Sequence, residues 1–417
     1  MKRSRYLDVL RGIALLGILP VNIVLFGLPF GAYEDPDYVT GGTLRERIAF
    51  HATSFFFEFK FVTLFSLLFG VGMVVMRERA NATGRSYRRV MLRRLLFLWL
   101  FGILHAALVW DGDILSYYAP LGLLVFWTSR WDSARLKKIG VALIALPAAV
   151  MLVLAVLAPF VPAIERGWQT IDNPPDPGPL ERPATESWGA FWAGMENWGS
   201  EFETQVRRDG TFLQITIVRF FSWFLGFLFW GIYMVWRIGG LFLLGMAWTK
   251  EGWLLSPGDH RAKFRRLALL GLACGLLLEG GSSLLGRLAP DTASWGLAGT
   301  FGHYAGSLGL AAAYAGAVGL LLARWPKSRA FVPFEAVGRT AFSNYLLQSI
   351  LCTTLFYSYG FALFGSLGRA ELWGVAGCVW AIQLAVSPLW LSRFRIGPFE
   401  WIWRSLTYWK PQPWRSS

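Results

Sequence analysis

The 417-residue chain is 55% hydrophobic and only 16% charged, and its formal net charge at pH 7 is +14. A soluble globular domain carries about a quarter of its residues as charged side chains, so this composition excludes that class of protein. The positive charge alone would suit a nucleic-acid-binding protein, but the Lys and Arg residues lie in short loops between apolar segments. We therefore expect an integral protein of the lipid bilayer that binds no nucleic acid.

Ten apolar segments have the length of transmembrane helices, since a helix needs roughly 20 apolar residues to cross about 30 Å of hydrocarbon. In chain order these segments are 8–28, 54–76, 91–110, 114–129, 138–162, 212–249, 267–285, 301–323, 341–360 and 372–391. The predicted fold is all-α: a polytopic membrane helix bundle of about ten transmembrane helices. Residues 1–417 would form a single integral membrane domain.

The sixth segment, 212–249, is too long for one straight crossing of the bilayer. It contains two charged residues, Arg219 and Arg237, and then the pair Gly239-Gly240. An odd number of crossings is needed to keep the later loops on alternating sides. We expect one crossing with a break or an interfacial lead-in near Gly239.

Basic residues cluster in alternate loops, which is the positive-inside pattern of a multi-pass protein. The clusters lie before the first segment and after the second, fourth, sixth, eighth and tenth, and they include Lys2, Arg3, Arg5, Arg77, Arg79, Arg85, Arg130, Arg135, Lys137, Arg261, Lys263, Arg324, Lys327, Arg393 and Arg395. The opposite loops are acidic, and the longest of them, 163–210, contains a proline-rich run at 173–179 that cannot form a regular helix. We expect both termini to be cytoplasmic and 163–210 to be an extracytoplasmic loop that caps the bundle.

The first predicted helix carries polar residues on one face. Arg11 and Asn22 are eleven residues apart, so their directions around the helix differ by only about 20°. Asp8 lies one turn from Arg11 and can pair with it. Ionisable groups cost about 2.5–3.5 kcal/mol or more at the centre of a membrane helix, so each one marks a candidate site. The alternative is a topology-setting arginine with a structural aspartate partner.

The third predicted helix repeats this spacing with chemically different residues. Arg94 and His105 are also eleven residues apart, Arg93 lies beside the first of them, and Asp113 follows the helix. A histidine can move a proton near neutral pH, and a carboxylate can orient its ring and favour its charged form. The alternative is a histidine that only hydrogen-bonds a neighbouring helix.

The second predicted helix begins with Glu58 and Lys60, which are two residues apart and so cannot face each other on a helix. We expect Lys60 to point inward as a site residue. Glu279 would pair with Arg219 or Arg237. Three later polar residues in the spans, His303, Asn344 and Gln348, are the kind that often only join neighbouring helices.

If these faces converge, two clusters form at opposite ends of a polar path. The outer cluster contains Asn22, Lys60, His105 and Asp113, and the inner cluster contains Arg11, Arg93, Arg94 and Arg339. The inner arginines would attract phosphate groups at the cytoplasmic mouth. No group of residues has the spacing of a metal site, so we expect no metal.

Several segments together resemble the bacterial YeiB-type family of multi-pass membrane proteins. The matching segments are 7–18 with Asn22, 60–61 with 64–70, 93–94 with Gly102 and His105, 113–115 with 118–119, and 338–340 with 344–349. The resemblance extends over nearly the whole chain. It implies a protein of the bacterial cytoplasmic (inner) membrane.

The first-helix motif is also similar to that of transmembrane acyltransferases such as heparan-α-glucosaminide N-acetyltransferase. That resemblance implies an acyl-CoA co-substrate on the cytoplasmic side, an acceptor across the membrane and an intramembrane histidine at the reaction centre. The acyltransferase pattern His-Ala-x-Trp in the second span is only echoed here by His51-Ala52, without the tryptophan. We therefore favour His105 over His51 as the reactive histidine.

The leading functional hypothesis is transfer of an acyl group from cytoplasmic acyl-CoA to a small-molecule or envelope glycan acceptor. His105 would be the general base, Asp113 would orient it, and Asn22 or Lys60 would stabilise the oxyanion. The inner arginines would hold the phosphates of coenzyme A. One alternative is a transporter or exporter that uses the same polar path, and another is a non-catalytic membrane scaffold. The sequence does not indicate the oligomeric state.

Overall fold

The computed structural model describes residues 4–415 except 36, 39–41, 173–179, 181 and 290. Over these residues the chain forms α-helices and short 3-10 turns and no β-strand. The predicted all-α polytopic membrane bundle is confirmed. The proline-rich run 173–179 and the basic residues Lys2 and Arg3 lie outside the described residues.

Within the part of the chain that the structure describes, eight helical stretches are long and apolar enough to cross a membrane. They comprise α1 (Arg5–Gly27), α3 (Leu44–Phe56) joined to α4 (Lys60–Ala82), α5 (Tyr87–Leu108), α7 (Ser133–Leu157), α11 (Phe212–Lys250), α12 (Arg261–Leu288), α13 (Ala293–Arg324) and α16 (Arg369–Arg393). The remaining two predicted spans are also helical but shorter: α6 (Leu115–Val125) and α15 (Ala341–Phe356). Every predicted segment is thus a helix, and the two short ones contribute to the bundle without spanning it alone.

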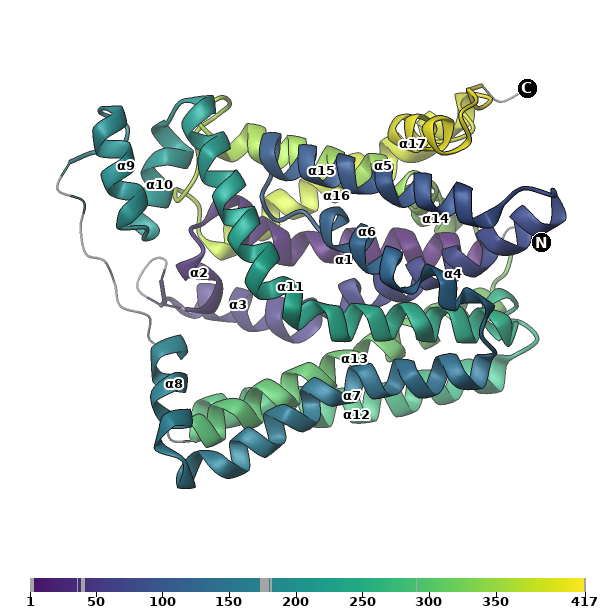
Figure 1. Ribbon diagram of the computed structural model, residues 1–417, viewed down its shortest axis with the longest axis horizontal. Coiled ribbons are helices and arrows are strands. Elements are labelled where there is room, and N and C mark those ends of the chain that lie inside the picture. Colours follow the sequence, from purple (N-terminus) through teal and green to yellow (C-terminus); the bar gives the residue numbers. More distant parts are fainter. Residues whose placement is uncertain are drawn as a thin grey trace.

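Smaller helices lie at the two ends of the bundle. They are α2 (Gly31–Glu34), α8 (Pro162–Asp172), α9 (Trp188–Glu196), α10 (Ser200–Asp209), α14 (Val332–Arg339) and α17 (Pro398–Tyr408). Figure 1 shows the long helices running side by side, with the N- and C-termini and α17 at one end and α8, α9 and α10 at the other. We call the end with the two termini the basic end, because the loops there carry the arginine clusters, and we call the opposite end the loop end.

The helix α11 corrects one prediction. It is a single helix of 39 residues that runs through Gly239 and Gly240 without interruption, so the expected break there is wrong. Figure 1 shows instead that it runs obliquely at the loop end and then along the bundle axis. Its two buried arginines donate hydrogen bonds to other parts of the bundle. Arg219 donates to the Leu108 carbonyl and the Tyr359 hydroxyl, and Arg237 donates to Thr63 Oγ1 at 2.9 Å.

The second predicted span is divided where α3 meets α4. Phe59 adopts a left-handed conformation, with φ of 59°, between the two helices. A non-glycine residue in this region is uncommon and persists only when its surroundings hold it there. Phe59 packs against the His303 ring and lies under the Arg237 guanidinium, with centroid distances of 5.5 and 5.4 Å. This turn places Glu58 and Lys60 on either side of the helix break.

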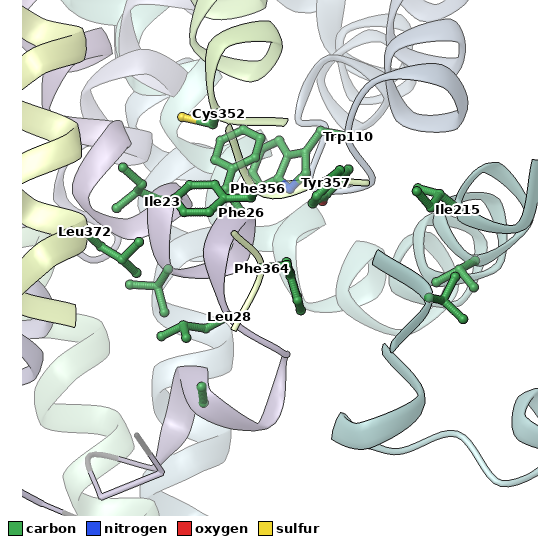
Figure 2. Packing of buried hydrophobic residues seen from close by; sticks show 14 of the residues in the cluster. Ile23, Phe26, Leu28, Trp110, Ile215, Cys352, Phe356, Tyr357, Phe364 and Leu372 are labelled. Carbon is green, nitrogen blue, oxygen red and sulfur yellow. The ribbon is translucent and has the colours of Figure 1, made fainter. Parts of the chain in front are cut away.

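A hydrophobic cluster joins the 163–210 segment to the bundle at the loop end. Phe191 of α9 and Phe202 of α10 are fully buried in the same cluster as Phe26 of α1 and Phe356 of α15. Figure 2 shows Phe26 beside Trp110 and Phe356, with Tyr357 and Phe364 next to them. The described part of this segment is therefore a packed cap over the helix ends.

Candidate functional site

A histidine and an aspartate form the centre of the site. His105, in the last turn of α5, lies with Nδ1 at 3.0 Å from Asp113 Oδ1, and the two residues are only 3% and 2% exposed. Asp113 Oδ2 accepts a hydrogen bond from the Ser116 amide at 2.6 Å. An ionised carboxylate can only accept, so this contact places the ring proton on Nδ1 and leaves Nε2 as a basic lone pair. Within the described structure His105 Nε2 is buried and has no hydrogen-bond partner.

The local sequence explains this geometry. The chain reverses through 109–114 between α5 and α6, and Asp113 then accepts a hydrogen bond from the Ser116 amide in the first turn of α6. Gly102 lies against these two residues. A Cβ atom there would stand 2.4 Å from the Ser116 nitrogen and 2.8 Å from Asp113 Oδ2. Only glycine lets α6 begin this close to α5, so Gly102 fixes the approach of the aspartate to the histidine.

A tyrosine from a distant part of the chain completes the centre. The Tyr345 hydroxyl of α15 donates to Asp113 Oδ1 at 3.3 Å and accepts from the Ile114 amide at 3.3 Å. The Tyr345 ring also lies beside the His105 ring, with a centroid distance of 5.1 Å. We call His105, Asp113 and Tyr345 the His105 centre. Tyr345 lies within one of the segments that carry the family resemblance, but no role was predicted for it.

On the loop-end side Asp113 lines a large cavity of about 670 Å³, which we call the outer pocket, and His105 lies behind Asp113 and is not among the described wall residues. Its wall combines acidic and aromatic side chains, including Asp111, Asp113, Glu203, Trp110, Tyr117, Trp198, Trp223 and Tyr33. The buried Arg207 of α10 also lines it and pairs with Asp111 at 2.8 Å and with Glu203 at 3.0 Å. Arg207 thereby ties the cap to the α5–α6 connection. Arg207 was not predicted as a site residue, because nothing in the sequence shows that a charged residue of the predicted loop becomes buried.

On the basic-end side lies a second cavity of about 260 Å³, which we call the inner pocket. Four arginines line it: Arg11, Arg94, Arg339 and Arg404. Tyr345 and Ile114 also line it, and Ile114 is shared with the outer pocket. The hydrogen bond from Tyr345 to Asp113 therefore crosses a thin wall between a cationic pocket and an acidic, aromatic one.

The predicted inner arginines have different surroundings. Arg11 pairs with Asp8 at 3.1 Å, as the spacing suggested. The Arg94 guanidinium stacks 3.6 Å above the Trp403 ring of α17. Arg93, its sequence neighbour, lies over Trp409 instead and is not part of the inner-pocket wall in the described structure. Arg404 lines the inner pocket instead of Arg93. It was not predicted because the short helix α17 was not predicted.

The predicted outer residues are only partly brought together. His105 and Asp113 are in contact, but the described contacts of Lys60 are with Glu279 and the Ser54 carbonyl. Asn22 is half-buried on α1 and, among the described wall residues, belongs to neither pocket. The ion pair of Glu279 with Lys60 also corrects the prediction that Arg219 or Arg237 would be its partner. Both arginines are occupied by carbonyl and hydroxyl oxygens.

Two bacterial proteins are similar to the chain over nearly its whole length. The chain is 33% identical to the uncharacterized protein YxaH of Bacillus subtilis, over 99% of this chain and 96% of that protein. It is 32% identical to the uncharacterized protein YeiB of Escherichia coli, over 98% of this chain and 97% of that protein. The chain belongs to the YeiB-type family. A family described as a protein of unknown function, DUF418, also matches residues 248–410.

The residues that match DUF418 include only part of the candidate site of this YeiB-type protein. Tyr345, Arg339 and Arg404 lie inside the matched residues, whereas His105 and Asp113 precede them. The full-length similarity to YxaH and YeiB spans both parts. The His105 centre is therefore assembled from two segments of the chain, and the DUF418 part alone does not contain its histidine.

Proposed function

We propose that this YeiB-type protein is an acyltransferase of the bacterial cytoplasmic membrane. It would move an acyl group from acyl-CoA, bound at the basic end, to a hydroxyl or amine acceptor that enters the outer pocket. The observation that carries this proposal is the position of the His105 centre. Asp113 borders the outer pocket, Tyr345 borders the arginine-lined inner pocket, and the two are hydrogen-bonded at 3.3 Å.

The inner pocket suits the proposed donor in both charge and polarity. Arginine binds phosphate oxygens through paired hydrogen bonds, and the four arginines come from four different helices, α1, α5, α14 and α17. The rest of the wall is mainly apolar, with Leu15, Ile18, Phe65, Leu68, Phe69, Met73 and Leu98 available for an acyl chain. The phosphates would remain near the basic end while the thioester reaches toward Tyr345.

The chemistry would be general base catalysis at the unpartnered nitrogen. His105 Nε2 takes the proton of the acceptor hydroxyl or amine as the acceptor oxygen or nitrogen attacks the thioester carbonyl. Asp113 holds the ring through Nδ1 and stabilises the imidazolium that forms. The tetrahedral intermediate then expels the thiol of coenzyme A, which takes the proton from His105 Nε2. The C–S bond breaks, a C–O or C–N bond forms, and His105 returns to its neutral state.

The test uses purified full-length protein, labelled acetyl-CoA and a panel of sugar and amine acceptors. We expect acyl transfer by the wild type and its loss in His105→Ala, with the helical content unchanged. Arg94→Ala should weaken acyl-CoA binding, while Arg93→Ala is the matched control because Arg93 lies outside the inner pocket. Unchanged acyl-CoA binding by Arg94→Ala would remove the donor assignment.

Transport is the second candidate function, because the two pockets are separated only by the Ile114 and Asp113–Tyr345 wall. Opening of that wall would connect the two ends of the bundle. Proton-coupled uptake into liposomes without acyl-CoA, together with no acyl transfer, would favour this function. If the wild type is inactive in both assays and the His105→Ala variant still folds, the result would favour a non-catalytic scaffold.

A further inference from the structure

A second group of ionisable side chains lies in the bundle apart from the His105 centre. It contains Tyr33, Glu58, Lys60, Glu279 and His303, which we call the Lys60 network. Lys60 forms an ion pair with Glu279 of α12, and His303 Nδ1 of α13 lies 2.7 Å from Glu279 Oε1. His303 Nε2 lies 3.5 Å from Glu58 Oε2. The network thus joins α2, the α3–α4 turn, α12 and α13.

Burial makes this network costly. Lys60 is 0% exposed and Glu279 is 1% exposed. Charged groups inside a membrane bundle persist when they are paired or when they form a path for ions or protons. A simple ion pair would not need the second carboxylate and the imidazole. Their presence points to a role beyond helix association.

Two buried atoms of the network make no hydrogen bond in the described structure, Glu279 Oε2 and His303 Nε2. The second of them faces the Glu58 carboxylate at 3.5 Å, an ion-pair contact rather than a short hydrogen bond. Gly306 of α13 makes room for the carboxylate, because a Cβ atom there would stand 2.7 Å from Glu279 Oε2. Full pairing is the rule for buried polar atoms, so two unsatisfied ones in a single network require an explanation.

One end of the network reaches a cavity. The Tyr33 hydroxyl donates to Glu58 Oε1 at 2.6 Å, and Tyr33 itself lines the outer pocket together with Phe59. From Tyr33 the groups continue in order through Glu58, His303 and Glu279 to Lys60. We propose that the Lys60 network is a proton-binding and proton-transfer site, supplied from the outer pocket and independent of acyl transfer at the His105 centre.

The transfer changes only N–H and O–H bonds. A proton on the Glu58 carboxyl passes to His303 Nε2, and the ring releases the proton of Nδ1 to Glu279. One proton has then moved from Glu58 to Glu279, and the imidazole is neutral before and after. When Glu279 is neutralised, the Lys60 ammonium keeps the Ser54 carbonyl as acceptor at 2.6 Å. An imidazole suits this step because its two nitrogens accept and donate at opposite sides of one ring.

Groups on the surrounding helices donate hydrogen bonds to neutral oxygens close to the network. Arg237 of α11 donates to the Tyr304 carbonyl, Thr63 Oγ1 and Ser307 Oγ, each at 2.9 Å. Tyr314 of α13 donates to the Phe56 carbonyl at 3.1 Å. The described ion pairs of the two carboxylates are those with Lys60 and His303.

The experiment is infrared difference spectroscopy of the full-length protein in lipid nanodiscs during a pH titration. The readout is the carbonyl band of a protonated carboxylic acid. We expect the wild type to show a pH-dependent band that Glu58→Gln and Glu279→Gln each reduce by the share of one carboxyl group. His303→Gln should shift the midpoint of the band. Lys60→Met with Glu279→Gln provides a charge-neutral version that keeps the helices packed.

Two controls make the outcome decisive. Glu335→Gln alters a carboxylate that is paired with Arg5 at the basic end, at 3.0 Å, and should leave the band unchanged. His105→Ala should also leave it unchanged while abolishing acyl transfer, so the two proposals can fail separately. Identical pH-dependent spectra for the wild type, Glu58→Gln and the Lys60→Met, Glu279→Gln double variant would overturn the proton site.

Discussion

The His105 centre and the Lys60 network both bury a histidine against a carboxylate, but they differ in what surrounds the pair. In the His105 centre the carboxylate Asp113 accepts from two neutral donors, the Ser116 amide and the Tyr345 hydroxyl, and a cavity borders each of Asp113 and Tyr345. Around His303 the partners are two carboxylates, Glu58 and Glu279, of which Glu279 also pairs with Lys60, and the outer pocket borders the Tyr33 end of this network. The first arrangement suits a base that meets two substrates, and the second suits movement of a proton between fixed groups.

The largest expected effect is on chemistry at the His105 centre. Asp113→Asn keeps the shape of the side chain but lets its amide donate to the ring, which favours the wrong tautomer of His105. We expect the acyl-transfer rate to fall by about 10²–10⁴-fold, the range that general base catalysis contributes. The measurement is turnover with labelled acetyl-CoA at saturating donor. A rate within twofold of the wild type would show that His105 is not the general base and so does not differ from His303 in the way proposed.

The next effect is on stability at the Lys60 network. Lys60→Ala leaves the Glu279 carboxylate buried without its cation, which costs about 3–5 kcal/mol when one partner of a buried pair is removed. Thermal unfolding in detergent should show a clear loss for this variant. The Lys60→Met, Glu279→Gln double variant should recover most of the loss, because no unpaired charge remains. Equal destabilisation by the single and double variants would contradict the ion pair as the cause.

Two glycines provide a test of whether the polar groups are separate. Gly102→Ala places a methyl group against Asp113 and Ser116, and Gly306→Ala places one against Glu279. Overpacking of this kind costs about 1–3 kcal/mol. We expect Gly102→Ala to reduce acyl transfer and leave the infrared titration intact, and Gly306→Ala to have the reverse effect. If either variant impaired acyl transfer and the infrared titration equally, the His105 centre and the Lys60 network would have to be regarded as one functional unit.

The smallest expected effect concerns Arg93. Its guanidinium lies 5.5 Å from the Trp409 ring, a cation–π contact worth about 0.5–1 kcal/mol at an exposed site. Arg93→Ala should therefore lower stability slightly and leave acyl-CoA binding within about twofold of the wild type. Equilibrium binding measured beside Arg94→Ala checks this. Equal losses in the two variants would mean that charge alone, rather than position at the inner pocket, holds the donor.

Much of the His105 centre could be predicted because its main contact is local. His105 and Asp113 are eight residues apart across one helix reversal, so spacing and residue type were enough to pair them. The positions of the ten apolar segments followed from hydrophobicity in the same way. Asp8 and Arg11, one turn apart on α1, are a further local pair of this kind.

The remaining contacts could not be predicted because they depend on how distant helices pack. Lys60 and Glu279 are 219 residues apart, and Tyr345 lies 232 residues from Asp113. Neither separation leaves a pattern in one sequence, so Glu279 was assigned the wrong partner. Helix α17 was missed because its 11 residues lie along the basic end and lack the apolar length of a span. Arg404 could not be assigned to the inner pocket without it.

The unbroken helix α11 has a mechanical consequence. Its Trp223 donates to Ser116 Oγ beside the His105 centre, at 2.9 Å, and its Arg237 donates to Thr63 Oγ1 close to the Lys60 network, also at 2.9 Å. These two anchor points are separated by roughly 21 Å of continuous helix. Because the helix is continuous between these two hydrogen bonds, a displacement of α11 at one of them would strain the other. A ligand that displaced α11 in the outer pocket would thus affect both the His105 centre and the Lys60 network, although these two groups share no residue.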